Sequence, residues 1–209
     1  MASAAERRAQ MVERQLRQRG ICDERVLRAM EQVPRERFVP KAERRRAYRD
    51  GALPIGEGQT ISQPWIVATM IALLELEGPE RVLEIGTGSG YSAAVLARCC
   101  SHVVTVERHA PLARRAATTL AELDYRNVEV RRGDGSAGQP DRAPFDAIVV
   151  TAAAAAGPPA ALTKQLASGG TLVCPINRGS DDEQLVRVRE GVTEAIAAVR
   201  FVALVEDAT

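Results

Sequence analysis

The stretch from Arg81 to Tyr91, RVLEIGTGSGY, constrains the fold of this chain more than any other feature. Its first five residues predict a short apolar strand, and residues 91–98 predict a helix. Between them glycine occupies every second position, at Gly86, Gly88 and Gly90. Glycine allows positive φ angles and lets a ligand approach the backbone closely, and the first turn of a helix presents free N–H groups. The stretch therefore predicts a ligand-binding turn at the end of a strand.

An acidic residue follows where a nucleotide-binding sheet needs one. Residues 103–106 predict a second strand that ends on Glu107, about 20 residues past the glycines, where such sheets use an acid to bind ribose hydroxyls. A glycine turn that binds nothing is the simpler alternative, and the position of Glu107 argues against it.

The acids around the glycine loop favour one kind of ligand. A dinucleotide fingerprint reads G-x-G-x-x-G and faces a pyrophosphate, whereas the spacing here is E-x-G-x-G-x-G from Glu84 to Gly90. Carboxylates at Glu84 and Glu107 would repel a pyrophosphate but suit a ligand with ribose hydroxyls, an ammonium group and a positive sulfur. The loop resembles motif I of S-adenosylmethionine-dependent methyltransferases, with a nicotinamide cofactor as the alternative.

Composition narrows the classes of function. The net charge is +1 over 209 residues, which gives no overall argument for nucleic acid. No apolar run is long enough to span a membrane, and charged residues interrupt the region where a signal peptide would be apolar. The four cysteines form no C-x-x-C pair, so neither a zinc site nor a disulfide framework is indicated. We expect a cytoplasmic monomer with reduced thiols, no metal, and no nucleic-acid or membrane partner.

The chain before the glycine loop divides into two parts. A helix over residues 3–20 and a second helix capped by Asp23 predict an α-helical appendage over residues 1–50. Residues 51–209 are expected to form the ligand-binding domain.

A local basic run lies near the end of this appendage. It comprises residues 44–46, with Arg35 and Arg37 nearby. The run is either a solvated face or a docking surface for an acidic peptide or substrate.

Residues 48–65 are rich in glycine and proline. They predict a long loop without regular structure, and such a loop inside a compact domain is usually functional. A helix over residues 64–76 follows. Trp65, at its start, is either a structural tryptophan or the wall of a pocket beside the loop.

The rest of the chain alternates helices and strands. Helices are predicted over residues 110–123 and 158–166, and strands over residues 127–130, 145–150 and 171–176. Residues 183–189 and 195–204 predict an antiparallel hairpin around Gly191. Thr151 and the small residues after it fall at the carboxyl end of a central strand, where open α/β sheets bind ligands, although close packing would also explain them. The pattern predicts a three-layer α/β fold with a mostly parallel sheet.

The sequence of residues 52–64, ALPIGEGQTISQP, resembles the signature of protein-L-isoaspartate O-methyltransferases. The resemblance continues, in the same order, through residues 82–91, 133–135, 143–153 and 169–173. Many methyltransferases share the glycine loop, whereas the stretch from Gln59 to Pro64 is specific to this family. The resemblance implies a Rossmann-like methyltransferase fold, with S-adenosylmethionine as cofactor and S-adenosylhomocysteine as product.

The resemblance also implies a set of cofactor-binding residues. Asp134, after the third parallel strand, would meet the adenine amino group. The full set is Gln59, Thr60, Ile61, Glu84, Gly86, Thr87, Gly88, Ser89, Gly90, Glu107, Arg108, Asp134, Gly135 and Thr151.

The implied substrate is the free α-carboxylate of an L-isoaspartyl residue in a damaged protein or peptide. Its methyl ester would close to a succinimide, which hydrolyses partly to normal aspartate. Ser62 would be the catalytic residue, its hydroxyl orienting the carboxylate; a turn hydroxyl bonded to its own backbone is the alternative. The substrate-binding residues would be Ser62, Pro64, Trp65, Val202 and Leu204.

Three positions depart from the family pattern. The family uses a late Phe-Val-Pro-Leu-like strand to pair with the substrate backbone by strand addition. This chain has Ala203 in place of the proline, with pairing through Val202 expected to survive. Ser92 and Gln139 stand where glutamine and tryptophan are more usual.

The chemistry needs no general base. A carboxylate nucleophile has a pKa of about 4 and is ionised at neutral pH. Holding the carboxylate oxygen, methyl carbon and sulfur in line can lower the barrier by roughly 7–11 kcal/mol. Three alternatives stay open: a relative that methylates ordinary aspartate to tailor a peptide, a non-catalytic module that binds the cofactor or isoaspartyl protein, and a small-molecule O-methyltransferase.

Overall fold

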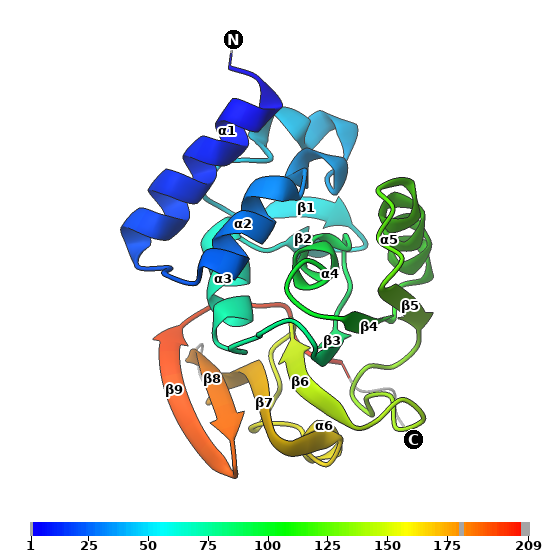
Figure 1. Cartoon of the computed structure of the whole chain (residues 1–209). Coiled ribbons are helices and arrows are strands. Elements are labelled where there is room, and N and C mark those ends of the chain that lie inside the picture. Colours follow the sequence, from blue (N-terminus) through cyan, green and yellow to red (C-terminus); the bar gives the residue numbers. More distant parts are fainter. Residues whose placement is uncertain (1, 180–181, 206–209) are drawn as a thin grey trace.

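A seven-stranded sheet forms the centre of the molecule, in a computed structural model that describes residues 2–179 and 182–205 (Figure 1). Its strand order is β5-β4-β3-β6-β7-β8-β9. The pairs from β5 to β7 are parallel, and β8 runs antiparallel to β7 and β9. The strands are β3 (Arg81–Ile85), β4 (His102–Glu107), β5 (Val128–Arg132), β6 (Phe145–Val150), β7 (Leu166–Asn177), β8 (Glu183–Arg189) and β9 (Val192–Ala198).

Both faces of the sheet are covered, because the central strands are apolar on both sides. On one face, Val82, Val103 and Ala147 join a core cluster with residues of several helices, which include α2 (Glu24–Gln32), α3 (Pro64–Ala72), α4 (Tyr91–Leu96) and α5 (Ala110–Glu122). On the other face, Leu83, Val104 and Ile148 pack with Leu162 of the short helix α6 (Ala160–Thr163). The expected Rossmann-like three-layer α/β fold is confirmed, with a thin third layer.

The N-terminal helices form as expected from their capping residues. Helix α1 (Ala4–Met11) starts with a capping box at Ser3 and continues through a π turn (Val12–Leu16) and a 3₁₀ turn (Arg17–Arg19). It ends at Gly20, whose φ is 90°. Asp23 caps α2 by accepting the N–H groups of Arg25 and Val26.

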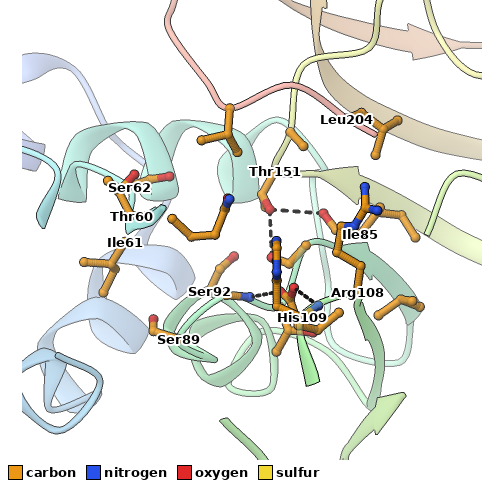
Figure 2. A pocket seen from close by; sticks show the side chains of 18 of the residues that line it. Thr60, Ile61, Ser62, Ile85, Ser89, Ser92, Arg108, His109, Thr151 and Leu204 are labelled. Atoms are coloured by element: carbon orange, nitrogen blue, oxygen red, sulfur yellow. Dashed lines mark hydrogen bonds between the residues drawn. The ribbon is translucent and has the colours of Figure 1, made fainter. Parts of the chain in front are cut away.

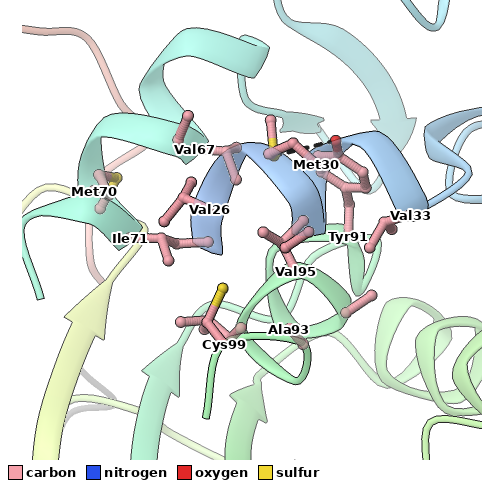
Figure 3. Packing of buried hydrophobic residues seen from close by; sticks show 14 of the residues in the cluster. Val26, Met30, Val33, Val67, Met70, Ile71, Tyr91, Ala93, Val95 and Cys99 are labelled. Atoms are coloured by element: carbon pink, nitrogen blue, oxygen red, sulfur yellow. Dashed lines mark hydrogen bonds between the residues drawn. The ribbon is translucent and has the colours of Figure 1, made fainter. Parts of the chain in front are cut away.

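These helices share the hydrophobic core of the sheet. Figure 3 shows Val26 and Met30 of α2 facing Val67 and Ile71 of α3 and Val95 of α4. Two short 3₁₀ helices (Arg35–Arg37 and Lys41–Arg46) carry the chain from α2 to the first strand. The division of the chain at residue 50 stays a prediction.

The predicted loop over residues 48–65 is wrong in its central part, residues 53–61. This part forms a small antiparallel hairpin of β1 (Leu53–Gly56) and β2 (Gln59–Ile61). The turn residues Glu57 and Gly58 have φ angles of 53° and 68°, which suit a two-residue hairpin turn. Buried apolar side chains alternate with exposed residues along β1, a pattern that the glycines and Pro54 obscure in the sequence.

The last strand also differs from the prediction. Glu190 and Gly191, with φ angles of 50° and 76°, make the turn, so β9 already begins at Val192 and ends at Ala198. Residues 199–205 leave the sheet, and Ala203 bridges to Ala153, just after β6. The expected strand over 195–204 is wrong in its second half because this segment finds its partner at the carboxyl end of the parallel sheet.

Candidate active site

A cavity of about 400 Å³ lies at the carboxyl ends of β3, β4 and β6 (Figure 2). The hairpin strand β2 and the segment after β9 form its other sides. A cavity of this size suits a small-molecule ligand. Its walls come chiefly from residues 59–62, 85–89, 106–109, 151–152 and 202–205.

The glycine loop is built into the rear of this cavity. The N–H groups of Gly86 and Thr87 both donate to the carbonyl of Val106, which ties the loop to β4. Gly86 has a φ of 96°, and a Cβ at that position would lie 2.3 Å from Oγ1 of Thr151. The Thr151 hydroxyl in turn contacts the Gly86 carbonyl at 2.7 Å. Only glycine fits this turn, as the sequence pattern predicts.

Glu107 is a cavity-lining carboxylate held by two backbone amides. Its Oε2 accepts the N–H of Gly88 at 2.8 Å, and its Oε1 accepts the N–H of His109 at 2.9 Å. Each oxygen keeps further lone-pair capacity. The arrangement can accept two neighbouring hydroxyl groups, and the assignment to ribose stays a prediction.

Glu84 lies beneath the loop and does not line the cavity. It is 0 % exposed, and its Oε2 accepts the hydroxyl of Thr105 at 2.6 Å. Its Oε1 has no hydrogen-bond partner among the described residues. Burial raises the pKa of Glu84 to about 7, with the nearby charge of Glu107 a smaller contribution. Glu84 therefore lies behind the residues that line the cavity. A direct contact between Glu84 and the cofactor stays a prediction.

The loop after β5 carries Asp134 and Gly135 behind the cavity. The two carboxylate oxygens of Asp134 accept the N–H and hydroxyl of Ser136, at 2.8 and 2.9 Å. A Cβ at Gly135 would lie 2.5 Å from Cγ2 of Ile85, which lines the cavity. Gly135 therefore allows Ile85 to pack, and the adenine assignment of Asp134 stays a prediction.

A second cavity, of about 720 Å³, adjoins the first one. Residues from the N-terminal helices, from α3 and from the segment after β9 line it, including Arg19, Trp65 and Phe201. The two cavities share four wall residues, which are Thr60, Ser62, Thr151 and Val202. A ligand in one cavity can therefore meet a ligand in the other across this wall.

Ser62 has a free hydroxyl at this shared wall. Its carbonyl accepts a hydrogen bond from Nη2 of Arg35 at 2.7 Å. Its hydroxyl forms no hydrogen bond with any described residue, its own backbone included, which argues against the turn-hydroxyl alternative. The hydroxyl can therefore donate to a bound substrate.

The other residues expected to bind substrate differ in whether they line a cavity. Trp65 lines the second cavity, and the guanidinium carbon of Arg19 lies 4.8 Å from its ring centroid, which favours the pocket-wall alternative. Pro64 is buried at the first position of α3 and lines neither cavity. Val202 and Leu204 line the first cavity.

Pairing of a substrate strand through the carbonyl of Val202 is not open, which corrects the expectation from sequence. That carbonyl accepts the N–H of Ala153 at 2.8 Å, and the N–H of Leu204 donates to the Ala153 carbonyl at 2.8 Å. The N–H and carbonyl of Ala203 form no hydrogen bond among the described residues. Any strand addition here would use the edge of Ala203, because peptide groups alternate in direction along an extended segment.

Comparison with known proteins identifies the family. The family model for protein-L-isoaspartate(D-aspartate) O-methyltransferase matches residues 6–209. The chain belongs to this family. It is therefore a methyltransferase whose methyl donor is S-adenosylmethionine.

Similar proteins in this family cover almost the whole chain. Protein-L-isoaspartate O-methyltransferase 1 of Rhodopseudomonas palustris (strain HaA2) is 54 % identical over 98 % of this chain and 85 % of that protein. The protein of the same name from Serratia proteamaculans (strain 568) is 52 % identical over 96 % of this chain and 97 % of its own. A solved protein-L-isoaspartate O-methyltransferase superimposes with a TM-score of 0.85 at 30 % identity, over 94 % of this chain and 65 % of that one.

The structure adds site residues that sequence reasoning missed in this family member. Tyr91, Ser92 and His109 line the first cavity. Arg35 donates a hydrogen bond to the carbonyl of Ser62. His109 could have been found from its place two residues after Glu107. Nothing in the sequence separates Arg35 from Arg37 or from the basic run at residues 44–46. Arg35 is nevertheless 0 % exposed, so a solvated face is the wrong expectation for this residue.

Neither a membrane-spanning helix nor a metal-binding cluster is found among the described residues. No helix among them combines the length and apolar character needed to cross a membrane. Within residues 2–179 and 182–205, no three histidine, cysteine, aspartate or glutamate side chains gather in a way that could hold a metal ion.

Proposed function

We propose that this chain methylates the free α-carboxylate of L-isoaspartyl residues in proteins and peptides. The observation that carries the proposal is the unpartnered hydroxyl of Ser62, at the wall shared by two adjoining cavities. The first cavity has the features of a nucleoside site, and we assign the second, larger cavity to the peptide. The names of the two relatives, both protein-L-isoaspartate O-methyltransferases, agree with this substrate.

The residues of the first cavity fit S-adenosylmethionine. The Glu107 carboxylate is oriented for hydroxyl groups, and the absence of a side chain at Gly86 leaves the loop backbone close to Thr151. Apolar side chains of Ile85 and Val106 supply surfaces for a base and a thioether-like chain. The bound cofactor supplies a methyl group on a positively charged sulfur.

The protein's part in catalysis is to position the substrate. An isoaspartyl α-carboxylate is ionised at neutral pH because its pKa is near that of an ordinary carboxyl group. The Ser62 hydroxyl donates a hydrogen bond to one carboxylate oxygen, which leaves the other oxygen to attack. Thr60 and Thr151 lie in the same wall and limit how the carboxylate can turn. Such orientation lowers the barrier without any proton transfer.

Methyl transfer from labelled S-adenosylmethionine to a synthetic L-isoaspartyl peptide, beside its L-aspartyl twin, tests this proposal. Label on the isoaspartyl peptide alone is the expected result. A preference for the aspartyl twin would point instead to a peptide-tailoring enzyme. Cofactor binding without transfer to either peptide would leave a non-catalytic binding module as the better account.

The state of the protein in the cell is also part of the proposal. We propose a monomer that works in the cytoplasm without a nucleic-acid partner, and the net charge of +1 gives no overall argument for nucleic acid. Light scattering after gel filtration measures the oligomeric state, and a dimer mass would contradict this part.

A further inference from the structure

Arg35 is an unusual residue for the interior of a protein. Its side chain is 0 % exposed, and it is the largest of the fully buried side chains in the described part of the chain. Burial lowers the pKa of its guanidinium group. No described carboxylate pairs with it, so its charge is balanced only by neutral groups. Burying such a cation is expensive, and its retention calls for a specific role.

The contacts of Arg35 join three segments that are distant in the sequence. Its Nε donates to the carbonyl of Ala47 at 2.8 Å, and its Nη2 donates to the carbonyl of Ser62 at 2.7 Å. Its guanidinium carbon lies 4.8 Å from the ring centroid of Tyr91. Tyr91 follows the glycine loop directly and lines the first cavity. Arg35 therefore links the N-terminal region to two residues of the cavity wall, Ser62 and Tyr91.

Little else holds the main chain at Ser62. The register of the β1–β2 hairpin ends at Ile61, which pairs with Leu53. The helical hydrogen bonds of α3 begin with the carbonyl of Gln63, which accepts the N–H of Val67. Ser62 lies between these two elements, and Arg35 is the one described hydrogen-bond donor to its carbonyl.

We propose that Arg35 is a positioning residue, which fixes the main chain at Ser62 so that the serine hydroxyl faces the substrate carboxylate. The inference rests on the proposed function. The planar fork of a guanidinium group presents several N–H donors in fixed directions, so one side chain can hold the two carbonyls of Ala47 and Ser62 at a set separation. A lysine ammonium group has no such fork.

The test compares Arg35→Met and Arg35→Lys with the parent enzyme, on the L-isoaspartyl peptide. Methionine fills much of the space without donors, and lysine keeps the charge without the fork. Because small misplacements of a reacting group are costly, we expect kcat to fall on the order of 100-fold for Arg35→Met. Calorimetric titration should find a cofactor Kd close to that of the parent. The matched control is Arg37→Met, since Arg37 is 40 % exposed and pairs with Glu122 on the surface.

A double-mutant cycle separates positioning from general support of the fold. If Arg35 acts through Ser62, adding Arg35→Met to Ser62→Ala should cause little further loss of kcat. Losses that multiply in the double variant would overturn the inference. So would a parent-like kcat in both Arg35 variants, or a loss confined to cofactor affinity.

The test also covers a variant that does not fold and a parent that is inactive. If Arg35→Met does not fold, as judged by circular dichroism, Arg35→Lys decides, and a parent-like kcat for it would overturn the inference. If the parent itself methylates no isoaspartyl peptide, the proposed function fails and this inference falls with it. If the parent is active, Ser62→Ala is impaired and the Arg35 variants are not, the inference about Arg35 fails while the proposed function stands.

Discussion

Single side chains at the cavity wall are held in place before any ligand arrives. Two backbone N–H groups orient the Glu107 carboxylate, and a buried guanidinium group holds the Ser62 carbonyl. Groups that are already oriented lose less entropy when a ligand binds.

Replacing Glu107 should weaken cofactor binding. Glu107→Ala removes charged hydrogen-bond acceptors, and we expect a loss of about 1.5–3 kcal/mol in binding free energy. Isothermal titration with S-adenosylhomocysteine measures it. Glu107→Gln keeps one acceptor oxygen and should lose less, whereas parent-like affinity in both variants would contradict the ribose assignment.

Replacing Ser62 should slow turnover and spare cofactor affinity. Ser62→Ala deletes a hydrogen bond to a charged oxygen, and we expect kcat on the isoaspartyl peptide to fall about 10- to 100-fold. Ser101→Ala serves as the control, because that hydroxyl bonds to Pro79 and Glu80 at the other end of β3. An unchanged rate for Ser62→Ala would remove Ser62 from the mechanism.

Glu84 should make the unliganded protein less stable as the pH rises. Its pKa rises from 4.5 in the unfolded chain to about 7 in the fold, so between these values the folded state binds the proton that the unfolded state has lost. The free energy of unfolding therefore falls across this window, by roughly 3 kcal/mol at its upper end.

Urea denaturation between pH 4.5 and 8 measures this contribution. Glu84→Gln should flatten the decline, since its amide cannot ionise. Glu122→Gln, which changes an exposed acid, should leave the decline unchanged. A decline equal to that of the parent in Glu84→Gln would show that another group causes it.

At the scale of elements, two tight turns shape the first cavity. The loop from β3 to α4 forms its rear, and the β1–β2 hairpin delivers residues 59–62 to its side. Both turns depend on glycines with positive φ angles, at Gly86 and Gly58. The two glycines differ in their surroundings, because a Cβ would clash at Gly86 and would meet nothing within 4 Å at Gly58.

This difference predicts different costs for alanine at the two positions. Gly58→Ala adds only backbone strain, which should lower the free energy of unfolding by about 1–2 kcal/mol. Gly86→Ala adds a clash with Thr151 to the same strain, so it should lower stability further and abolish measurable cofactor binding. Thermal unfolding and titration with S-adenosylhomocysteine check both. Equal effects of the two substitutions would contradict the role assigned to close packing at Gly86.

At the scale of the whole molecule, the N-terminal helices and the sheet share one core. Leu27 of α2 is 1 % exposed within the cluster that also contains Val82 and Val103 of the sheet. Helices that share a core this way are expected to unfold together with the sheet.

Shortening the side chain of Leu27 should therefore destabilise the whole fold. Leu27→Ala should lower the free energy of unfolding by about 2–5 kcal/mol, in one transition seen by calorimetry. Val192→Ala, at a side chain that is 69 % exposed, should change it by less than about 0.5 kcal/mol. Two separate transitions would instead support an independent appendage over residues 1–50.

Local sequence patterns determined several elements of the fold and the family resemblance. The glycine spacing after residue 85, the cap at Asp23 and the apolar run of β6 each depend on neighbours in the sequence, so the turn, the helix start and the buried strand could be predicted. The resemblance carried by residues 52–64 also pointed to the family and to Ser62.

Only the tertiary structure decided which groups are buried and which partners they meet. In the sequence Arg35 cannot be told from the nearby Arg37, and only the fold buries it against Ala47, Ser62 and Tyr91. The segment at Ala203 lost its predicted strand because Ala153, about 50 residues earlier, offers its N–H and carbonyl. Glu84 lies behind the cavity because β3 alternates its side chains between two faces and α4 covers the face of Glu84. Burial and long-range pairing depend on how elements meet in space, which a local sequence pattern does not encode.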